Sequence, residues 1–377
     1  MWFSNNQADT VYCDRNSDNA SAILADLDLR FVGFPEEADL VWMRKGYIRQ
    51  FGNLKEYQLL NHVPGERAMT NKGHLTRHLK KPDQEPPDGI SLDEFYPETY
   101  CLYMGGDRDA FFAQLPPQDV RDNLWILKPA YLSRGEGIHI LWQFDQLKSD
   151  LQNPDQNLSI LEPGGKYVIQ KYIQNPFLLQ GFKSEIRIYW LIACLDPLLV
   201  LVYKEGTTRL TTQPFQLEEF DNPLVHIANS YQQKQHPDYE SFRLKWSFSE
   251  LESYITLELK LADPGFIEDQ LKAQIKKILR YVVHSAIKTL TRKPPQGLFF
   301  GLFGADLILD DTLRPWLTEV QKGPGLSHSD PVKKQVIPPM LQEAARIVLE
   351  VQQRKRKGAS LAKLDSVDGY EWMINMA

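Results

Sequence analysis

NLWILKPAYLSRGEGIHIL, residues Asn123–Leu141, reads as a short strand that ends on Lys128, a loop Ser133–Gly137 with two glycines, and a second strand from Ile138. Apolar side chains occupy both faces of the first strand, which predicts burial on both sides. Burying a strand that ends in a lysine is costly unless an anion meets the ammonium group. Backbone N–H groups of a glycine-containing loop can bind the same anion. The stretch therefore predicts a phosphate-binding hairpin.

Two common nucleotide motifs are excluded for this stretch. A Walker loop closes on Gly-Lys-Ser/Thr, and no such string occurs in the chain. A dinucleotide fold needs Gly-x-Gly-x-x-Gly at the start of a helix, but Gly135-Glu-Gly137 is followed by the strand-like Ile-His-Ile-Leu. A phosphate loop between antiparallel strands indicates an ATP-grasp type of site. An ordinary hairpin turn is the alternative at this point.

The composition is that of a soluble globular protein of two or three domains, with 377 residues and a formal net charge of -6. There is no basic excess, so neither nucleic acid nor membrane is expected as a partner. Cys13, Cys101 and Cys194 are too few and too far apart for a disulfide framework or a zinc site, which favours the cytoplasm. The N-terminus does not resemble a signal peptide. The apolar run Ile188–Tyr203 is interrupted by Asp196-Pro197, which predicts two buried strands joined by a turn.

Hydrophobic periodicity divides the chain into strand-rich and helix-rich parts. Strands dominate from Tyr100 to Tyr203, with a helix near Asp145–Leu151, and the pattern is helical from Asp263 to Leu290. The other predicted elements are a helix Ala20–Leu27, a strand Asp39–Met43, an exposed loop Lys81–Gly89, strands Tyr167–Ile173, Leu298–Leu309 and Trp316–Val320, and a helix Val336–Lys355. That last helix ends in the basic run Arg354–Lys357, which is either a solvated helix end or a contact for an acidic protein.

A second candidate site lies on the hairpin predicted from the strands that end at Leu309 and begin at Trp316. Asp306 and Glu319 are equally distant from the middle of the turn, so they face each other, and Gln321 shares the face of Glu319. Two facing carboxylates repel unless a cation or proton lies between them, and hard oxygen ligands suit Mg²⁺ bound together with phosphate. Solvated acids on a surface hairpin are the alternative.

Basic residues are concentrated between these two sites, at Lys171, Lys183, Arg187, Lys204 and Arg209. Lys183, Glu185 and Arg187 alternate along one strand and therefore share a face. A carboxylate flanked by two cations is either a polyphosphate clamp or the solvated end of a strand, and the pattern by itself leaves both open.

Taken in order, these motifs resemble those of the tubulin tyrosine ligase and tubulin tyrosine ligase-like family, which has an ATP-grasp fold. The resemblance runs from about residue 40 to about residue 330 and keeps the family's order of motifs. The matching strings are Leu54–Gln58, Asn61–Gly65, Lys72–Lys80, Phe95–Thr99, Trp125–Pro129, Ser133–Ile138, Val168–Ile173, Pro176–Leu179, Tyr203–Gly206 with Arg209, His226–Asn229, and Asp306 with Glu319–Gln321.

The resemblance implies roles for individual residues. The phosphates of ATP would be held by Lys128, Ser133, Arg134, Gly135, Gly137 and Ile138, and adenine would be contacted by Gln170, Lys171, Tyr172 and Ile173. The γ-phosphate and the developing acyl phosphate would meet Lys183, Glu185, Arg187 and Arg209, with His226 and Asn229 near ribose and substrate. Mg²⁺ would be bound by Asp306, Glu319 and Gln321. Arg187, Arg209 and Glu319 form the implied catalytic set.

The implied fold class is α/β (α+β), an ATP-grasp fold in three domains. They are a small N-terminal α/β domain at 1–65, a central domain with the phosphate loop at 66–175, and a C-terminal catalytic domain with the Mg²⁺ site and the last helix at 176–377. The implied activity is that of a cytoplasmic, monomeric ligase that uses ATP and Mg²⁺. It would join an amino acid to a protein, tubulin or another acidic tail, by an amide or isopeptide bond formed through an acyl phosphate.

Two alternatives to this activity stay open. One is a ligase for a small molecule or a peptide. The other is a nucleotide-binding regulatory or scaffold protein with weak catalysis, and it is motivated by departures from the family's motifs. Glu185, Ala228 and Gln321 stand where the family has aspartate, threonine and asparagine, and Gly73 stands where it has aspartate. Near-octahedral Mg²⁺ is intolerant of shifted ligands, so the longer Gln321 matters most.

Overall fold

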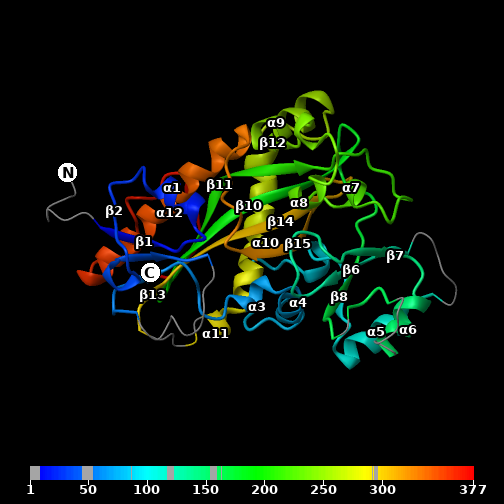
Figure 1. The fold of residues 1–377 in the computed structure, drawn as a ribbon, viewed down its shortest axis with the longest axis horizontal. Helices are drawn as coiled ribbons and strands as arrows, with labels where there is room; N and C mark the ends of the chain where they lie inside the picture. The colour runs from blue at the N-terminus through cyan, green and yellow to red at the C-terminus, as the bar shows by residue number, and fades with distance from the viewer. Residues whose placement is uncertain are drawn as a thin grey trace.

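The computed structural model describes residues 9–44, 54–85, 87–116, 123–152, 159–162, 164–290, 292 and 296–377 (Figure 1). The described chain is a mixed α/β protein, as the sequence predicts, and its strands form three sheets. The helices of the described residues include none that is long and apolar enough to cross a membrane.

The first sheet has five short parallel strands in the order β13-β4-β3-β1-β2. Their bounds are β1 (Thr10–Cys13), β2 (Arg30–Phe31), β3 (Leu40–Trp42), β4 (Leu59–Leu60) and β13 (Leu298–Phe299). The expected helix is α1 (Asp18–Leu24), and the expected strand Asp39–Met43 corresponds to β3. A strand from late in the chain, β13, thus completes a sheet that begins at the N-terminus.

The largest sheet has seven strands and runs through the centre of the molecule (Figure 1). Its main path is β12-β11-β10-β14-β15, with β16 paired to β11 and β9 paired to β10. The bounds are β9 (Leu178–Leu179), β10 (Phe182–Leu195), β11 (Leu198–Leu210), β12 (Lys245–Ser247), β14 (Gly301–Leu309), β15 (Pro315–Lys322) and β16 (Tyr370–Asn375). The predicted pair of buried strands joined at Asp196-Pro197 is confirmed as β10 and β11.

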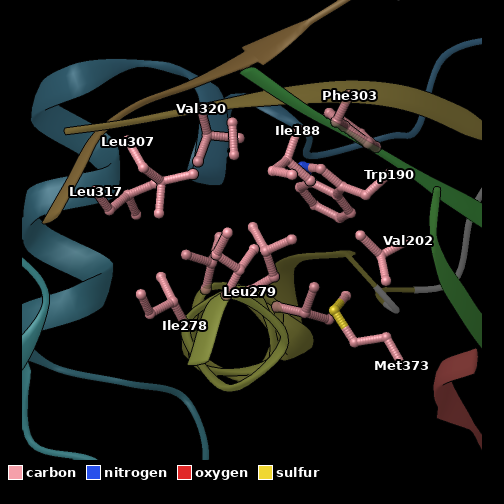
Figure 2. Close-up of a cluster of buried hydrophobic side chains, with 14 of the residues drawn as sticks. Ile188, Trp190, Val202, Ile278, Leu279, Phe303, Leu307, Leu317, Val320 and Met373 are labelled. Carbon is pink, nitrogen blue, oxygen red and sulfur yellow. The ribbon is translucent and has the colours of Figure 1, made fainter. Parts of the chain in front are cut away.

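Two helices cover the two faces of this sheet. On one face α10 (Lys272–Ser285) places Ile278 and Leu279 against the side chains of Ile188, Trp190 and Leu317 (Figure 2). On the other face α12 (Pro331–Arg356) packs against Tyr189 and Leu191. Successive strand residues point to opposite faces, so β10 contributes to both cores. Each fully buried large apolar side chain contributes about 1.5–3 kcal/mol, which makes this sheet the rigid base of the molecule.

The long C-terminal helix begins earlier than the predicted Val336, because Asp330 caps it and Pro331 occupies its first turn. Its basic end is engaged within the chain. Arg354 pairs with Glu350 and Asp365, and Arg356 pairs with Asp39. These pairs favour a structural role for the basic run over a contact with an acidic protein.

The third sheet has four antiparallel strands in the order β5-β8-β6-β7. The bounds are β5 (Thr99–Cys101), β6 (Trp125–Pro129), β7 (His139–Leu141) and β8 (Tyr167–Lys171). The predicted hairpin is confirmed, with Trp125 opposite Leu141. The flanking helices are α4 (Lys72–Lys80), α5 (Gly105–Gln114) and α6 (Asp145–Gln152). The prediction of strands after Tyr100 was wrong for α5, which buries only Phe111 and therefore has little helical periodicity.

The remaining helices are short. They are η1 (Pro35–Glu37), α3 (Arg67–Thr70), η2 (Leu92–Glu94), α7 (Pro223–His226), α8 (Ser230–Gln233), η3 (Tyr239–Ser241), α9 (Phe248–Ser253), η4 (Tyr254–Glu258), η5 (Phe266–Leu271) and α11 (Ile287–Leu290). The helical pattern predicted from Asp263 to Leu290 therefore corresponds to η5, α10 and α11. The predicted loop Lys81–Gly89 has no helix or strand among its described residues.

Candidate functional site

One pocket lies between the four-stranded sheet and the seven-stranded sheet, and most of the predicted site residues line it. They are Lys128, Gly135, Ile138, Gln170, Lys171, Tyr172, Ile173, Lys183, Glu185, His226, Asn229, Asp306 and Glu319. Arg187, Arg209 and Gln321 do not line the pocket but contact Asp306. Within the predicted loop Ser133–Gly137, only Gly135 lines the pocket, and Ser133, Arg134 and Gly137 do not. Ile138, which follows the loop, also lines the pocket.

The pocket also contains residues outside the predicted site. They are Lys72, Ile126, Ser184, Ile227, Ala228, Ile308 and Thr318. Lys72 matters most, because its Nζ lies 3.1 Å from Glu319 Oε1 and donates to the carbonyl of Leu132 at 2.9 Å. The only feature of the sequence that indicated a place for Lys72 in the site was its position at the start of a matched motif.

Lys128 is buried on β6 without a carboxylate partner among the described residues. Its Nζ donates to Gln170 Oε1 at 2.7 Å, and the Gln170 amide donates in turn to the hydroxyl of Thr99. Burial, assisted by the positive charge of Lys72, lowers the pKa of Lys128 to about 8. A buried ammonium that is held only by neutral groups favours binding of an anion.

The glycine loop after β6 needs its glycines for two reasons. Gly135 has a φ of 76° and Gly137 a φ of 65°, a region that side chains disfavour. A Cβ on Gly135 would lie 2.9 Å from Gln232 Cγ, and the amide of Gln232 donates to the carbonyl of Arg134 at 3.1 Å. The loop is therefore packed against Gln232 of α8.

A hydrogen-bonded chain links Lys183, Tyr172 and His226 inside the pocket. Lys183 Nζ donates to the Tyr172 hydroxyl at 2.7 Å, and that hydroxyl lies 2.8 Å from His226 Nδ1. His226 Nε2 lies 3.0 Å from the carbonyl of Glu219, which can only accept, so Nε2 carries the proton and Nδ1 accepts from Tyr172. Burial, then the charge of Lys183, lowers the pKa of His226 to about 4, so this imidazole is neutral at pH 7.

Asp306 is the centre of a buried charge network. Its Oδ2 accepts from Arg187 Nη2 at 2.8 Å and Gln321 Nε2 at 2.8 Å, and Arg209 Nη2 lies 2.9 Å away. Burial by itself raises the pKa of Asp306, but Arg187 and Arg209 outweigh burial, and the pKa lies below its ordinary value. Glu185 lies 2.5 Å from Arg209, yet burial and the nearby Asp306 raise its pKa.

The predicted opposition of Asp306 and Glu319 is confirmed, because the two residues are register partners on β14 and β15. Gln321 joins them as predicted from its position on the same face. Its Nε2 lies 2.8 Å from Asp306 Oδ2 and 3.2 Å from Glu319 Oε2, and its Oε1 accepts from Arg187 at 3.0 Å. In this arrangement the amide nitrogen, and not the amide oxygen, faces the carboxylates.

These features define a class of protein: a mixed α/β protein with a cationic pocket between two sheets and a carboxylate pair at one end. Similarity to known proteins identifies the family within this class. Residues 52–357 match the Tubulin-tyrosine ligase family, and the chain belongs to that family.

Relatives within the family have names that state different activities. The chain is 33% identical over 303 residues to the human probable tubulin polyglutamylase TTLL2, covering 78% of this chain and 47% of that protein. It is 29% identical over 296 residues to a probable beta-tubulin polyglutamylase of Tetrahymena thermophila, covering 75% of this chain and 23% of that protein. It is also 29% identical over 291 residues to the human inactive polyglycylase TTLL10, covering 74% of this chain and 42% of that protein. The chain spans about half or less of the length of these relatives.

Proposed function

We propose that this chain is an ATP-dependent ligase that joins an amino acid to a protein by an amide or isopeptide bond. The single observation that carries the proposal is the convergence of Lys128, Lys183 and the Asp306/Glu319 pair on one pocket. Cationic and carboxylate groups of this kind suit a nucleoside triphosphate bound together with a divalent ion. Membership in the Tubulin-tyrosine ligase family supports the same reaction. We assign the chain the ATP-grasp architecture with domains at 1–65, 66–175 and 176–377.

The roles within the pocket follow from charge and position. Lys128 and the loop Ser133–Gly137, with Ile138, would bind the α- and β-phosphates, and the strand end Gln170–Ile173 would contact adenine. Lys183, with Arg187 and Arg209 behind Asp306, would neutralise the γ-phosphate. Asn229 and the neutral His226 line the pocket on its α7–α8 side and would lie near ribose and substrate.

The donor set at the end of the pocket fits Mg²⁺. Asp306, Glu319 and the amide oxygen of Gln321 are hard ligands, and the two carboxylates are now neutralised by arginine, lysine and amide N–H groups. The amide of Gln321 would have to turn over to present its oxygen. When bound, Mg²⁺ would supply neutralisation of phosphate charge.

The reaction itself needs alignment and neutralisation more than a strong base. An acceptor carboxylate oxygen attacks the γ-phosphorus, and ADP leaves. The amine of the incoming amino acid then attacks the acyl carbon, loses a proton and displaces phosphate. Arg187 and Arg209 would stabilise the negative charge of both steps from behind Asp306, which both arginines contact.

The acceptor in this proposal is tubulin or another protein with an acidic tail, because the similar proteins are named as tubulin polyglutamylases. The chain would act as a monomer in the cytoplasm. A ligase that acts on a small molecule or peptide uses the same pocket, and the nature of its acceptor separates it from the first proposal.

A second function is favoured by one observation. Gln321 directs its amide nitrogen toward Asp306 and Glu319, where a metal ligand needs an oxygen. A protein that binds nucleotide but turns it over weakly would have this arrangement. The human relative TTLL10 is named an inactive polyglycylase, so loss of activity within the family has a precedent.

ADP release tests these proposals directly. Purified protein with Mg²⁺ and ATP is incubated with each amino acid in turn, with and without tubulin, and acceptors are then analysed by intact mass. We expect ADP release that depends on both an amino acid and the acceptor. ADP release without any amino-acid dependence would remove the ligase proposal.

A further inference from the structure

A second cavity, of about 880 Å³, adjoins β12, α8 and the start of α12 and carries an excess of positive charge. Its charged lining residues are Arg134, Lys234, Arg243, Lys245 and Lys333, against the two acids Glu240 and Asp330. Arg243 is neutralised outside this set, by Glu250. The remaining cations exceed the acids that face them, which is an unusual arrangement unless an anion binds there.

Lys245 is the most buried of these cations, with 5% exposure. It lies directly opposite Arg209 in the β11–β12 pair, and like charges in facing positions destabilise an antiparallel pair. The acids near Arg209 are already engaged, because Glu185 and Asp306 both pair with that arginine. Among the described residues Lys245 makes no ion pair, and its Nζ donates to the Ser230 hydroxyl at 3.2 Å.

Lys333 also lacks an ion pair within the described chain. It lies in the first turn of α12, where the positive end of the helix dipole disfavours a cation. Asp330 attracts both lysines, but its Oδ1 caps the helix by accepting from the N–H groups of Val332 and Lys333. Burial and then neighbouring cations lower the pKa of Lys245 to about 7 and shift that of Lys333 in the same direction.

We propose that Lys245 and Lys333 form a binding site for the carboxylate of a ligation substrate. The site adjoins the network of Arg187 and Arg209, where the reacting acyl phosphate would lie. Both substrates bring a carboxylate that the reaction does not consume: the incoming amino acid has its α-carboxylate, and an acidic acceptor has its further side chains. The identity of the ligand as a substrate rests on the proposed ligase function, whereas the anion site rests on the geometry alone.

Binding of labelled probes to the full chain tests the site without turnover. The probes are glutamate, glycine and an oligoglutamate peptide, each with a non-hydrolysable ATP analogue present. Lys245→Met and Lys333→Met should each weaken binding of a probe by about 10- to 100-fold, because each removes a charged hydrogen bond. Lys334→Met, which removes an exposed lysine one position further along α12, is the matched control and should bind like the parent.

The pattern of loss identifies the source of the carboxylate. Loss for free amino acids alone assigns the site to the incoming amino acid, and loss for the peptide alone assigns it to the acceptor. A parent that binds no probe, or two variants that bind like the parent, overturns the inference. Lys245→Arg keeps the charge and should keep binding, which separates loss of the site from loss of folding.

The two proposals fail in different ways. If the parent shows no ATP-dependent ligation but probe binding depends on both lysines, the ligase function falls and the anion site stands. If ligation proceeds and both methionine variants keep the parent's KM for amino acid and acceptor, the site falls and the ligase function stands.

Discussion

Asp306 and Glu319 face each other across β14 and β15, yet their charges are compensated from different parts of the chain. Asp306 is 2% exposed and is held by Arg187 and Arg209 of the same sheet. Glu319 is more exposed and pairs with Lys72 of α4, which flanks the four-stranded sheet. The buried Asp306 is therefore part of the structure of its sheet, and the half-buried Glu319 joins two parts of the molecule across the pocket.

This difference predicts that the two acids separate stability from activity. Asp306→Asn leaves two buried arginines short of a charge and should lower the free energy of unfolding by about 3–5 kcal/mol. Glu319→Gln breaks a partly exposed pair and should cost less than about 1 kcal/mol. Both should abolish amino-acid-dependent ADP release. Chemical denaturation and ADP release measure the two effects, and full turnover in Glu319→Gln would remove its metal role.

Lys128→Met should weaken nucleotide binding without lowering stability. The ammonium is buried beside neutral groups, so a methionine of similar length removes a desolvated charge and should leave the melting temperature equal or higher. Loss of one charged hydrogen bond to phosphate should weaken ATP binding by about 10- to 100-fold. Lys148→Met on α6 is the control, since Lys148 lies outside the pocket lining. Equal ATP affinity in the two variants would contradict the phosphate role of Lys128.

The same burial predicts that nucleotide affinity falls as the pH rises. Burial lowers the pKa of Lys128 to about 8 and that of Lys183 to about 7, from 10.5. The unfolded chain therefore binds more protons between about pH 7 and 10.5, so the free protein should gain stability as pH rises through this window. Bound phosphate favours the charged lysines, so binding takes up protons and weakens above about pH 7.

Titration with a fluorescent nucleotide at several pH values measures how affinity changes with pH. Thermal melts of the free protein at the same pH values measure how stability changes with pH. Glu185, Glu319, Asp306 and Lys72 contribute to the charge around these lysines, and Glu185, with its raised pKa, also titrates. Lys183→Met should reduce the slope of affinity against pH. An affinity that does not change with pH would show that the lysines are charged in the free protein.

Gly135→Ala tests the glycine loop against a matched turn. Gly135 and Gly164 both have a positive φ, but only at Gly135 would a Cβ meet other atoms within 4 Å. Both substitutions should cost about 1–2 kcal/mol of stability through backbone strain. Only Gly135→Ala should also weaken nucleotide binding, because the loop must move away from Gln232. Equal binding in the two variants would argue against a role of this loop in phosphate binding.

Local patterns predicted the features that depend on short-range geometry. The β6–β7 hairpin and the opposition of Asp306 and Glu319 both follow from strand periodicity and one turn. The ion pair between Lys72 and Glu319 joins residues 247 positions apart, and no periodicity reports such a contact. The cross-strand partner of Arg209 was missed for the same reason. Lys245 lies on the three-residue strand β12, which pairs with β11 although a long segment containing α7 and α8 separates the two strands in the sequence.

Substitutions of Gln321 test the proposed ligase against the proposed nucleotide-binding protein with weak turnover. Its amide nitrogen faces both carboxylates, and its side chain, one methylene longer than that of asparagine, lets the amide reach both of them. Gln321→Asn should withdraw the amide from Glu319, tighten binding of Mn²⁺ measured by electron paramagnetic resonance, and raise ADP release. Gln321→Glu should also tighten Mn²⁺ binding, because a third carboxylate adds charge to the donor set. If both variants bind Mn²⁺ like the parent, the length and orientation of Gln321 do not limit the site, and the weak-turnover alternative loses its structural support.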